Sequence, residues 1–261
     1  MTLTHHQPPS YMDPLTRHIP APRRAEALAR FVSQLQEELL GYPTDVGPIE
    51  LAVGYRPAAG DIGFGGDWYD VVAVDDDTTA LVVGDIAGHG ISAAAQMAQT
   101  KGVLRALIQG SHDHADVFKL ATRTLAHLDA VFVGTAAVAV LDRGARRLRW
   151  STAGHLPPLL RTASGSVELL WSERQPPIGL ATKSVALSER PVDLGSWLVL
   201  YTDGLVERRG SALDDRLHEL CTFVGRLEDS CSPEQVRDRV LEAMVGEGAS
   251  DDVAIVVARI R

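Results

Sequence analysis

Residues 81–90 read LVVGDIAGHG, an apolar run that ends in an aspartate between a glycine and an isoleucine. The run is typical of a buried β-strand, and Asp85 lies where the strand is expected to end. Three further segments place aspartates at the edge of apolar runs: GDWYD at 66–70, TDG at 202–204 and SDD at 250–252. Asp and Gly both favour turns, so one such cluster predicts only a turn. Four of them together indicate a shared site.

The segments around this stretch predict an α+β domain. Strands are expected at residues 49–55, 68–74, 79–86, 132–141, 146–152, 167–170, 196–202 and 253–260. Short turns at 75–77 and 142–144 favour hairpins, and therefore antiparallel pairing. Helical patterns are expected at 92–109, 113–131 and 233–245, and Ser232 and Pro233 suit the cap and first turn of the last one. The predicted architecture is an antiparallel sheet with long helices laid on it.

The first 48 residues are expected to lie outside the main domain, which we place at residues 49–261. Residues 1–22 contain five prolines and no periodicity, and predict a disordered tail. Residues 23–48 are expected to form one amphipathic helix, ended by Gly41 and Pro43, and a linker. The apolar stripe of this helix consists of Leu28, Phe31, Val32, Leu35 and Leu39. Two interpretations stay open: a helix packed on the core, or an arm that pairs with a second copy in a homodimer.

Composition excludes several classes of protein. The chain has 261 residues, 45% hydrophobic and 23% charged, which is typical of globular domains. Its net charge of −9 argues against binding to nucleic acid or to anionic lipid. No apolar run approaches the roughly 18 residues of a membrane span, and the N-terminus does not resemble a signal peptide, so we expect a cytoplasmic protein. Two cysteines ten positions apart match neither a disulfide framework nor a zinc site.

The electrostatics of the aspartate clusters favour a metal. Asp85 and Asp203 follow strands that are expected to be buried, and no Lys or Arg lies next to either in the sequence. Carboxylates about 5 Å apart repel by about 3 kcal/mol per pair at an effective dielectric near 20. Divalent cations would cancel that charge, and all-oxygen ligation favours Mg²⁺ or Mn²⁺ over zinc. The glycine spacing at 84–90 is not a dinucleotide fingerprint, so no nucleotide cofactor is expected.

Five motifs, taken in order, carry a family resemblance. They are GGDWYD at 65–70, GDIAGHG at 84–90, AGHLPP at 153–158, YTDGLVE at 201–207 and DDVA at 251–254. Together they resemble the PPM-type metal-dependent protein serine/threonine phosphatases (protein phosphatase 2C-like), and within these the bacterial SpoIIE/RsbU-like branch. The resemblance runs from about residue 49 to residue 261. It implies an αββα sandwich of two antiparallel sheets flanked by helices, with a dinuclear Mn²⁺ or Mg²⁺ site at one end.

The resemblance also implies roles for individual residues. Asp85 matches the carboxylate that bridges both metals, and Ile86 matches a residue that offers its backbone carbonyl. Asp67 matches a ligand of one ion. Asp203 and Asp251 match ligands of the other. Asp70 and Asp252 are expected to orient waters or loops around the site.

Two histidines have alternative interpretations. Related phosphatases with an Asp-Gly-His motif place a candidate general acid directly in it, whereas here Ile86 and Ala87 follow Asp85 and the histidine comes later. His89 is either the acid that protonates the leaving oxygen or a residue that hydrogen-bonds its own loop. His155 is expected to be a buried hydrogen-bonding residue.

The function implied by the resemblance is hydrolysis of phosphoserine or phosphothreonine by direct attack of metal-bound water. The implied substrate is a phosphorylated protein, such as an anti-sigma-factor antagonist in a bacterial partner-switching pathway. Two alternatives remain: a non-catalytic interaction module that keeps the fold, or a hydrolase of small phosphoesters.

Overall fold

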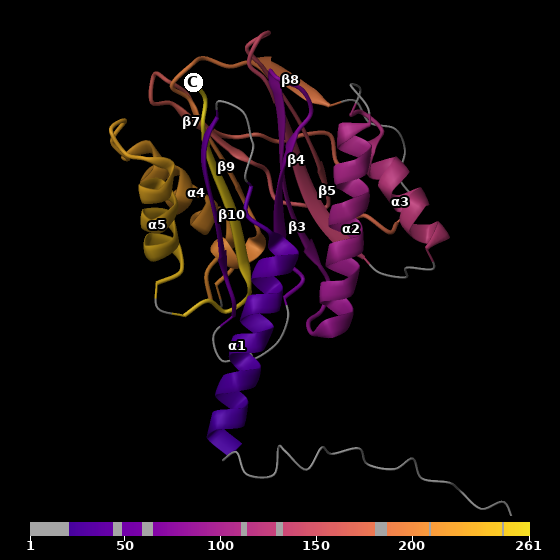
Figure 1. Ribbon diagram of the computed structural model, residues 1–261. Coiled ribbons are helices and arrows are strands. Elements are labelled where there is room, and N and C mark those ends of the chain that lie inside the picture. Colours follow the sequence, from indigo (N-terminus) through magenta and orange to yellow (C-terminus); the bar gives the residue numbers. More distant parts are fainter. Residues whose placement is uncertain are drawn as a thin grey trace, which may run out of the picture.

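Two five-stranded antiparallel sheets stack face to face, and helices cover both outer faces (Figure 1). The structure is a computed structural model that describes residues 21–43, 49–58, 65–110, 114–128, 133–180, 187–208, 210–246 and 248–261. The arrangement confirms the expected α+β fold and its αββα layers. Among the described helices, none has the length and apolar character needed to cross a membrane.

One sheet has the strand order β2-β3-β4-β5-β8 and lies against α2 and α3. β2 pairs with β3, and β4 with β5, by hairpins, as the turn signals predict, whereas α2 and α3 lie between β3 and β4. In the first hairpin, the Asp75 carboxylate accepts the N–H groups of Asp77 (2.9 Å) and Thr78 (2.7 Å). The bounds are β2 Trp68–Ala73, β3 Thr78–Ile86, α2 Ile91–Gln109, α3 Val117–His127, β4 Gly134–Asp142, β5 Arg147–Ala153 and β8 Ser188–Pro191.

The other sheet has the order β1-β10-β9-β6-β7 and lies against α4 and α5. Ser232 caps α5 through its hydroxyl, which accepts the Gln235 N–H, while the Gln235 side chain accepts the Ser232 N–H. This capping box fixes the helix start predicted from sequence. The bounds are β1 Glu50–Arg56, β6 Leu159–Arg161, β7 Val167–Leu169, β9 Trp197–Tyr201, the short 3₁₀ helix η2 Asp203–Leu205, α4 Leu213–Gly225, α5 Pro233–Met244 and β10 Val253–Arg259.

Side-chain alternation along the central strands produces two apolar layers. In β9, Leu198 and Leu200 belong to the core between the sheets, whereas Val199 packs in the layer under α4 and α5. Because successive strand residues point to opposite faces, a strand that is covered on both sides is apolar throughout. Tyr201 at the end of β9 and Val253 at the start of β10 are both buried, which fixes the ends of the two loops beside them.

Among the described elements, α4, β6, β8 and the short helix η2 were not predicted from sequence. β8 reads Ser-Glu-Arg-Pro at the edge of its sheet and β6 has only three residues, so neither carries an apolar alternation of its own. The helix predicted at 113–131 is observed over Val117–His127. Residues 113 and 129–131 lie outside the described residues.

The N-terminal helix α1 spans Ala21–Leu40 and extends beyond the body of the sandwich (Figure 1). Residues 1–20 of the predicted tail and residues 44–48 of the predicted linker lie outside the described residues. One edge of the helix is packed: Val32 is buried and clusters with Ala94 of α2. Phe31 and Leu35 on the same stripe are 60% and 38% exposed. The stripe is thus divided between the core and the surface.

Candidate metal centre

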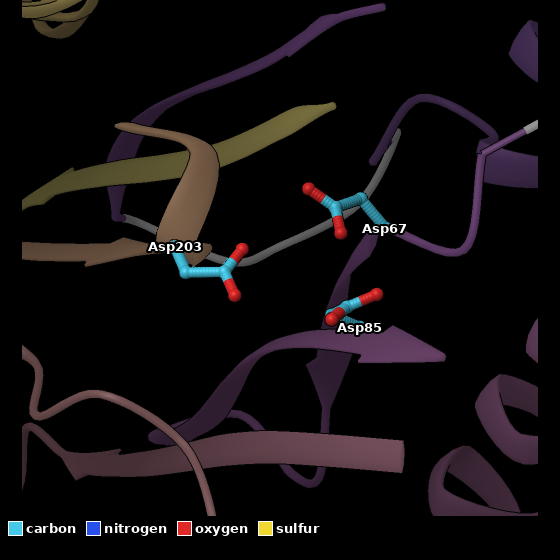
Figure 2. A group of neighbouring side chains, drawn as sticks. All are labelled: Asp67, Asp85 and Asp203. Carbon is cyan, nitrogen blue, oxygen red and sulfur yellow. The ribbon is translucent and has the colours of Figure 1, made fainter. Parts of the chain in front are cut away.

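Asp67, Asp85 and Asp203 meet at one end of the sandwich. Each offers a carboxylate oxygen, and these oxygens lie within 4.8 Å of one another. Figure 2 shows the three side chains converging from separate parts of the chain. Asp67 precedes β2, Asp85 lies at the end of β3, and Asp203 opens η2 after β9. The cluster therefore joins carboxylates from both sheets.

Close backbone approach places Asp67 beside Asp85. β2 and β3 pair with Trp68 opposite Gly84, and the Ile86 N–H donates to the Gly66 carbonyl at 3.1 Å. A Cβ on Gly66 would lie 2.1 Å from the Ile86 carbonyl oxygen, so only glycine fits there. The glycine of the GDWYD motif is thereby explained, and it brings Asp67 and the Ile86 carbonyl to the same edge.

Thr202 anchors Asp203 to β10. The Thr202 N–H donates to the Ala254 carbonyl at 3.0 Å, and the Thr202 hydroxyl accepts the Ala254 N–H at 2.8 Å. The Asp203 carbonyl then accepts the N–H groups of Val206 (2.8 Å) and Glu207 (2.7 Å), which closes the turn after the strand. Hydrogen bonds therefore hold the backbone both before and after Asp203.

The cluster concentrates negative charge without a cation from the protein. Within the described part of the chain, no lysine or arginine forms an ion pair with any of the three aspartates. Burial, together with the charge of Asp85, raises the pKa of Asp67 well above its usual range. Burial raises the pKa of Asp85, and burial with the charges of Asp85 and Glu207 raises that of Asp203 to about 6.

The donor set fits divalent cations. Oδ2 of Asp67 is buried and has no hydrogen-bond partner among the described residues. A buried acceptor without a partner is costly, and a cation would satisfy it together with the neighbouring carboxylates. Because the donors are all oxygens, they suit Mg²⁺ or Mn²⁺.

The other predicted site residues lie around this cluster. The Ile86 residue is buried, at the edge where Asp67 and Asp85 meet. Asp251 is exposed and lies outside the group of three; its Oδ1 accepts the Asp252 N–H at 2.8 Å, while its charge contributes to the raised pKa of Asp85 and Asp203. His89 is exposed on the turn between β3 and α2.

Asp70 has a different role from the one expected. Its buried carboxylate accepts the Nε of Arg105 at 2.9 Å and also pairs with Nη2 of Arg105, so it binds α2 to β2. Arg105, Lys101 and the end of α1 surround it in a small cavity of about 210 Å³. Asp70 therefore belongs to a structural junction of α1, α2 and β2.

His155 is a hydrogen-bonded structural residue, as predicted. Its Nδ1 lies 2.6 Å from the Thr135 hydroxyl on β4, and its Nε2 lies 3.1 Å from the Tyr201 carbonyl on β9. Burial lowers the pKa of the imidazole to about 4, so the ring is neutral at pH 7. The histidine joins the two sheets close to the cluster.

Sequence reasoning missed two residues near the cluster. Thr202 lies beside Asp67, and Tyr55 on β1 lies beside Asp252 and Asp67. Thr202 could have been suspected from its position next to Asp203. No signal in the sequence marks Tyr55, because its proximity depends on the pairing of β1 with β10.

Comparisons with known proteins agree with this geometry. The model of the family described as Stage II sporulation protein E (SpoIIE) matches residues 75–261. The phosphoserine phosphatase RsbP of Bacillus subtilis is 30% identical over 158 residues, which cover 56% of this chain and 38% of RsbP. The chain thus corresponds to well under half of that relative.

Two solved structures share the fold. One contains the RsbU and RsbW domains of Rv1364c from Mycobacterium tuberculosis, with a TM-score of 0.73, 31% identity, and coverage of 83% of this chain and 62% of that one. The SiaA-PP2C domain of Pseudomonas aeruginosa has a TM-score of 0.72, 20% identity, and coverage of 93% and 100%. With the family model matching most of the chain and the acidic cluster in place, the protein belongs to the SpoIIE family, a bacterial branch of the PPM-type phosphatases.

Proposed function

We propose that this protein is a metal-dependent phosphatase that hydrolyses phosphoserine or phosphothreonine in a protein substrate. The observation that carries the proposal is the convergence of Asp67, Asp85 and Asp203, with no cationic partner among the described residues. Its relative RsbP is named a phosphoserine phosphatase, which supports the same chemistry here.

The proposed ligands are the carboxylates of Asp67, Asp85, Asp203 and Asp251 and the backbone carbonyl of Ile86. A carboxylate oxygen of Asp85 lies within 4.8 Å of one from Asp67 and one from Asp203, which suits a bridging ligand. Two bound Mn²⁺ or Mg²⁺ ions would activate a water as nucleophile and stabilise the oxygens of an in-line displacement at phosphorus. Asp251 lies outside the group of three, so its carboxylate would need to move to join the other donors.

A protein substrate is favoured over a small phosphoester by the surface around the cluster. Two open grooves of about 400 and 420 Å³ border Gly204 and Asp251, and both are lined by Glu207, Arg208 and Ser250. Open, polar grooves suit a polypeptide, whereas small ligands are usually enclosed. The similarity to the RsbU domain of Rv1364c supports membership of the SpoIIE/RsbU-like branch, and resemblance to that branch implies a phosphorylated anti-sigma-factor antagonist as the substrate.

The test is a phosphatase assay with Mn²⁺, with Mg²⁺ and with a chelator. The substrates are phosphorylated anti-sigma-factor antagonists from the same cell, free phosphoserine and p-nitrophenyl phosphate. We expect metal-dependent turnover that is fastest on a phosphoprotein. Equal turnover of free phosphoserine would support the small-molecule alternative, and no turnover with a protein that binds metal would support a non-catalytic module.

We also propose that α1 contributes to a homodimer. Phe31 and Leu35 stay exposed on a helix whose other edge is packed on α2. Replacing both residues by serine in the full chain is expected to reduce the mass in solution to that of one copy, measured by light scattering. The control is Leu180→Ser, which changes an exposed leucine (44%) elsewhere on the surface. An unchanged mass would contradict the proposal.

A further inference from the structure

Tyr55 places a phenol hydroxyl beside the acidic cluster, where the proposed reaction gives it no role. The residue lies on β1, and its hydroxyl lies beside the Asp252 carboxylate, which places it as a hydrogen-bond donor to that group. A tyrosine phenol is protonated at neutral pH, so beside a carboxylate it donates. The hydroxyl therefore acts as a fixed hydrogen-bond donor to Asp252.

Asp252 is held from one side by the end of β1. Its Oδ1 accepts the Ala58 N–H at 2.9 Å, while its Oδ2 lies on the side of the Tyr55 hydroxyl. β1 and β10 are paired, with Tyr55 opposite Ala254 and Arg56 opposite Val253. The Asp252 carboxylate thus binds the first strand of the domain to the loop that precedes the last one.

Asp252 also contacts the two segments that carry Asp67 and Asp203. A Cβ on Gly65 would lie 2.2 Å from both Oδ2 of Asp252 and the Tyr55 hydroxyl. A Cβ on Gly204 would lie 2.1 Å from the Asp252 carbonyl oxygen. Gly65 comes two residues before Asp67, and Gly204 comes directly after Asp203. Each segment therefore reaches its position by packing a glycine directly against Asp252.

We propose that Tyr55 is a positioning residue for metal binding, acting through Asp252. The hydrogen bond from Tyr55 fixes the Asp252 carboxylate, and Asp252 in turn sets where Asp67, Asp203 and the neighbouring Asp251 lie. This role rests on the proposed metal site. Tyr55 on β1 would support that site by a hydrogen bond to Asp252 in the loop before β10. Such supporting partners align ligands before the ion arrives and thereby strengthen its binding.

The direct test is Tyr55→Phe, which removes only the hydroxyl. We expect the dissociation constant for Mn²⁺, measured by calorimetry, to rise about 10- to 100-fold, the usual effect of removing such a partner. Activity should return when Mn²⁺ is raised enough to refill the site. The matched control is Tyr69→Phe, which removes a hydroxyl that donates to the Gly41 carbonyl at 3.1 Å in the α1 junction. That variant should bind Mn²⁺ like the wild type.

A double-mutant cycle tests whether Tyr55 acts through Asp252. Asp252→Asn disturbs the same contact from the other side, because an amide offers one acceptor oxygen in place of two. If the residues act as one unit, the double variant should bind Mn²⁺ less weakly than the product of the two single losses predicts. Additive losses, or wild-type affinity in Tyr55→Phe, would overturn the inference while leaving the metal site intact. A wild-type chain that bound neither Mn²⁺ nor Mg²⁺ would overturn the proposed function, and this inference with it.

Discussion

Asp67 and Asp70 are both buried and lie only three residues apart, yet their surroundings are opposite. Asp67 faces two further carboxylates and leaves one oxygen without a partner among the described residues. Asp70 faces Arg105, which neutralises it by a paired hydrogen bond. Burial alone therefore does not mark a metal ligand. The charge partner distinguishes the two roles. A buried carboxylate paired with an arginine stabilises the fold, whereas buried carboxylates without a cation from the protein favour binding of a metal ion.

The largest loss of activity is expected for a substitution in the cluster. Asp85→Asn should reduce turnover to background and abolish tight Mn²⁺ binding, because the proposed bridging ligand serves both ions. Asp76→Asn, in the exposed β2–β3 turn, is the control and should retain full activity. Both are measured as kcat on a phosphoprotein and as Mn²⁺ affinity. Substantial turnover by Asp85→Asn in the presence of EDTA would refute the two-metal interpretation.

A smaller effect is expected for the loop that follows the cluster. His89→Ala should lower kcat less than Asp203→Asn, since a general acid contributes about 10²–10⁴-fold whereas a lost ligand removes the nucleophile. The comparison is made on a phosphopeptide and on p-nitrophenyl phosphate, whose leaving group needs no protonation. Complete rescue of His89→Ala by the activated substrate would instead identify His89 as the acid.

Stability should respond to Asp70 in the way expected for a paired carboxylate. Asp70→Asn removes the charge that Arg105 needs, and we expect a loss of about 2 kcal/mol in the free energy of unfolding, reduced from a fully buried pair because Arg105 is partly exposed. The measurement is urea denaturation in EDTA, with Asp76→Asn as the control. If Asp70→Asn were as stable as the wild type, the junction would not be a stabilising contact.

The free energy of unfolding of the metal-free chain should depend on pH, with the sign set by Asp203. The pKa of Asp203 is raised to about 6 in the folded, metal-free chain, above its unfolded value, so the folded state favours the protonated form. Its contribution to stability is full below about pH 4 and is lost as the pH rises through 6. We expect the metal-free chain to lose about 1–3 kcal/mol over this window. Asp203→Asn should reduce this slope, and saturating Mn²⁺ should remove it; a slope unaffected by either change would contradict this assignment.

The parts of the molecule that sequence predicts are those with local signals. The hairpin between β2 and β3 follows from an Asp-rich turn between apolar runs, and the cluster aspartates follow from their places at strand ends. The missed helix α4 does carry a helical spacing in its buried Leu217, Leu220 and Val224, so periodicity could have found it. β8 could not be found in this way, because its pairing with β5 is supplied entirely by the tertiary context.

The site was predictable to a similar extent. Its aspartates are visible in the sequence, whereas the Tyr55–Asp252 contact joins positions almost two hundred residues apart through the register of β1 and β10. The different roles of Asp67 and Asp70 were equally hidden. Both belong to one motif, and only the packing of α2 on β2 brings Arg105 to one and not to the other.

The origin of the cluster in both sheets has a consequence for the mechanics of the whole domain. Asp85 and Asp203 lie more than a hundred positions apart, so an ion held between them closes a long chain loop in the manner of a removable crosslink. The free energy of metal binding then also stabilises the packing of the two sheets against each other. Chelation should accelerate hydrogen exchange of the backbone amides of β3 and β9, far beyond the residues that touch the ion, and reloading should slow it again.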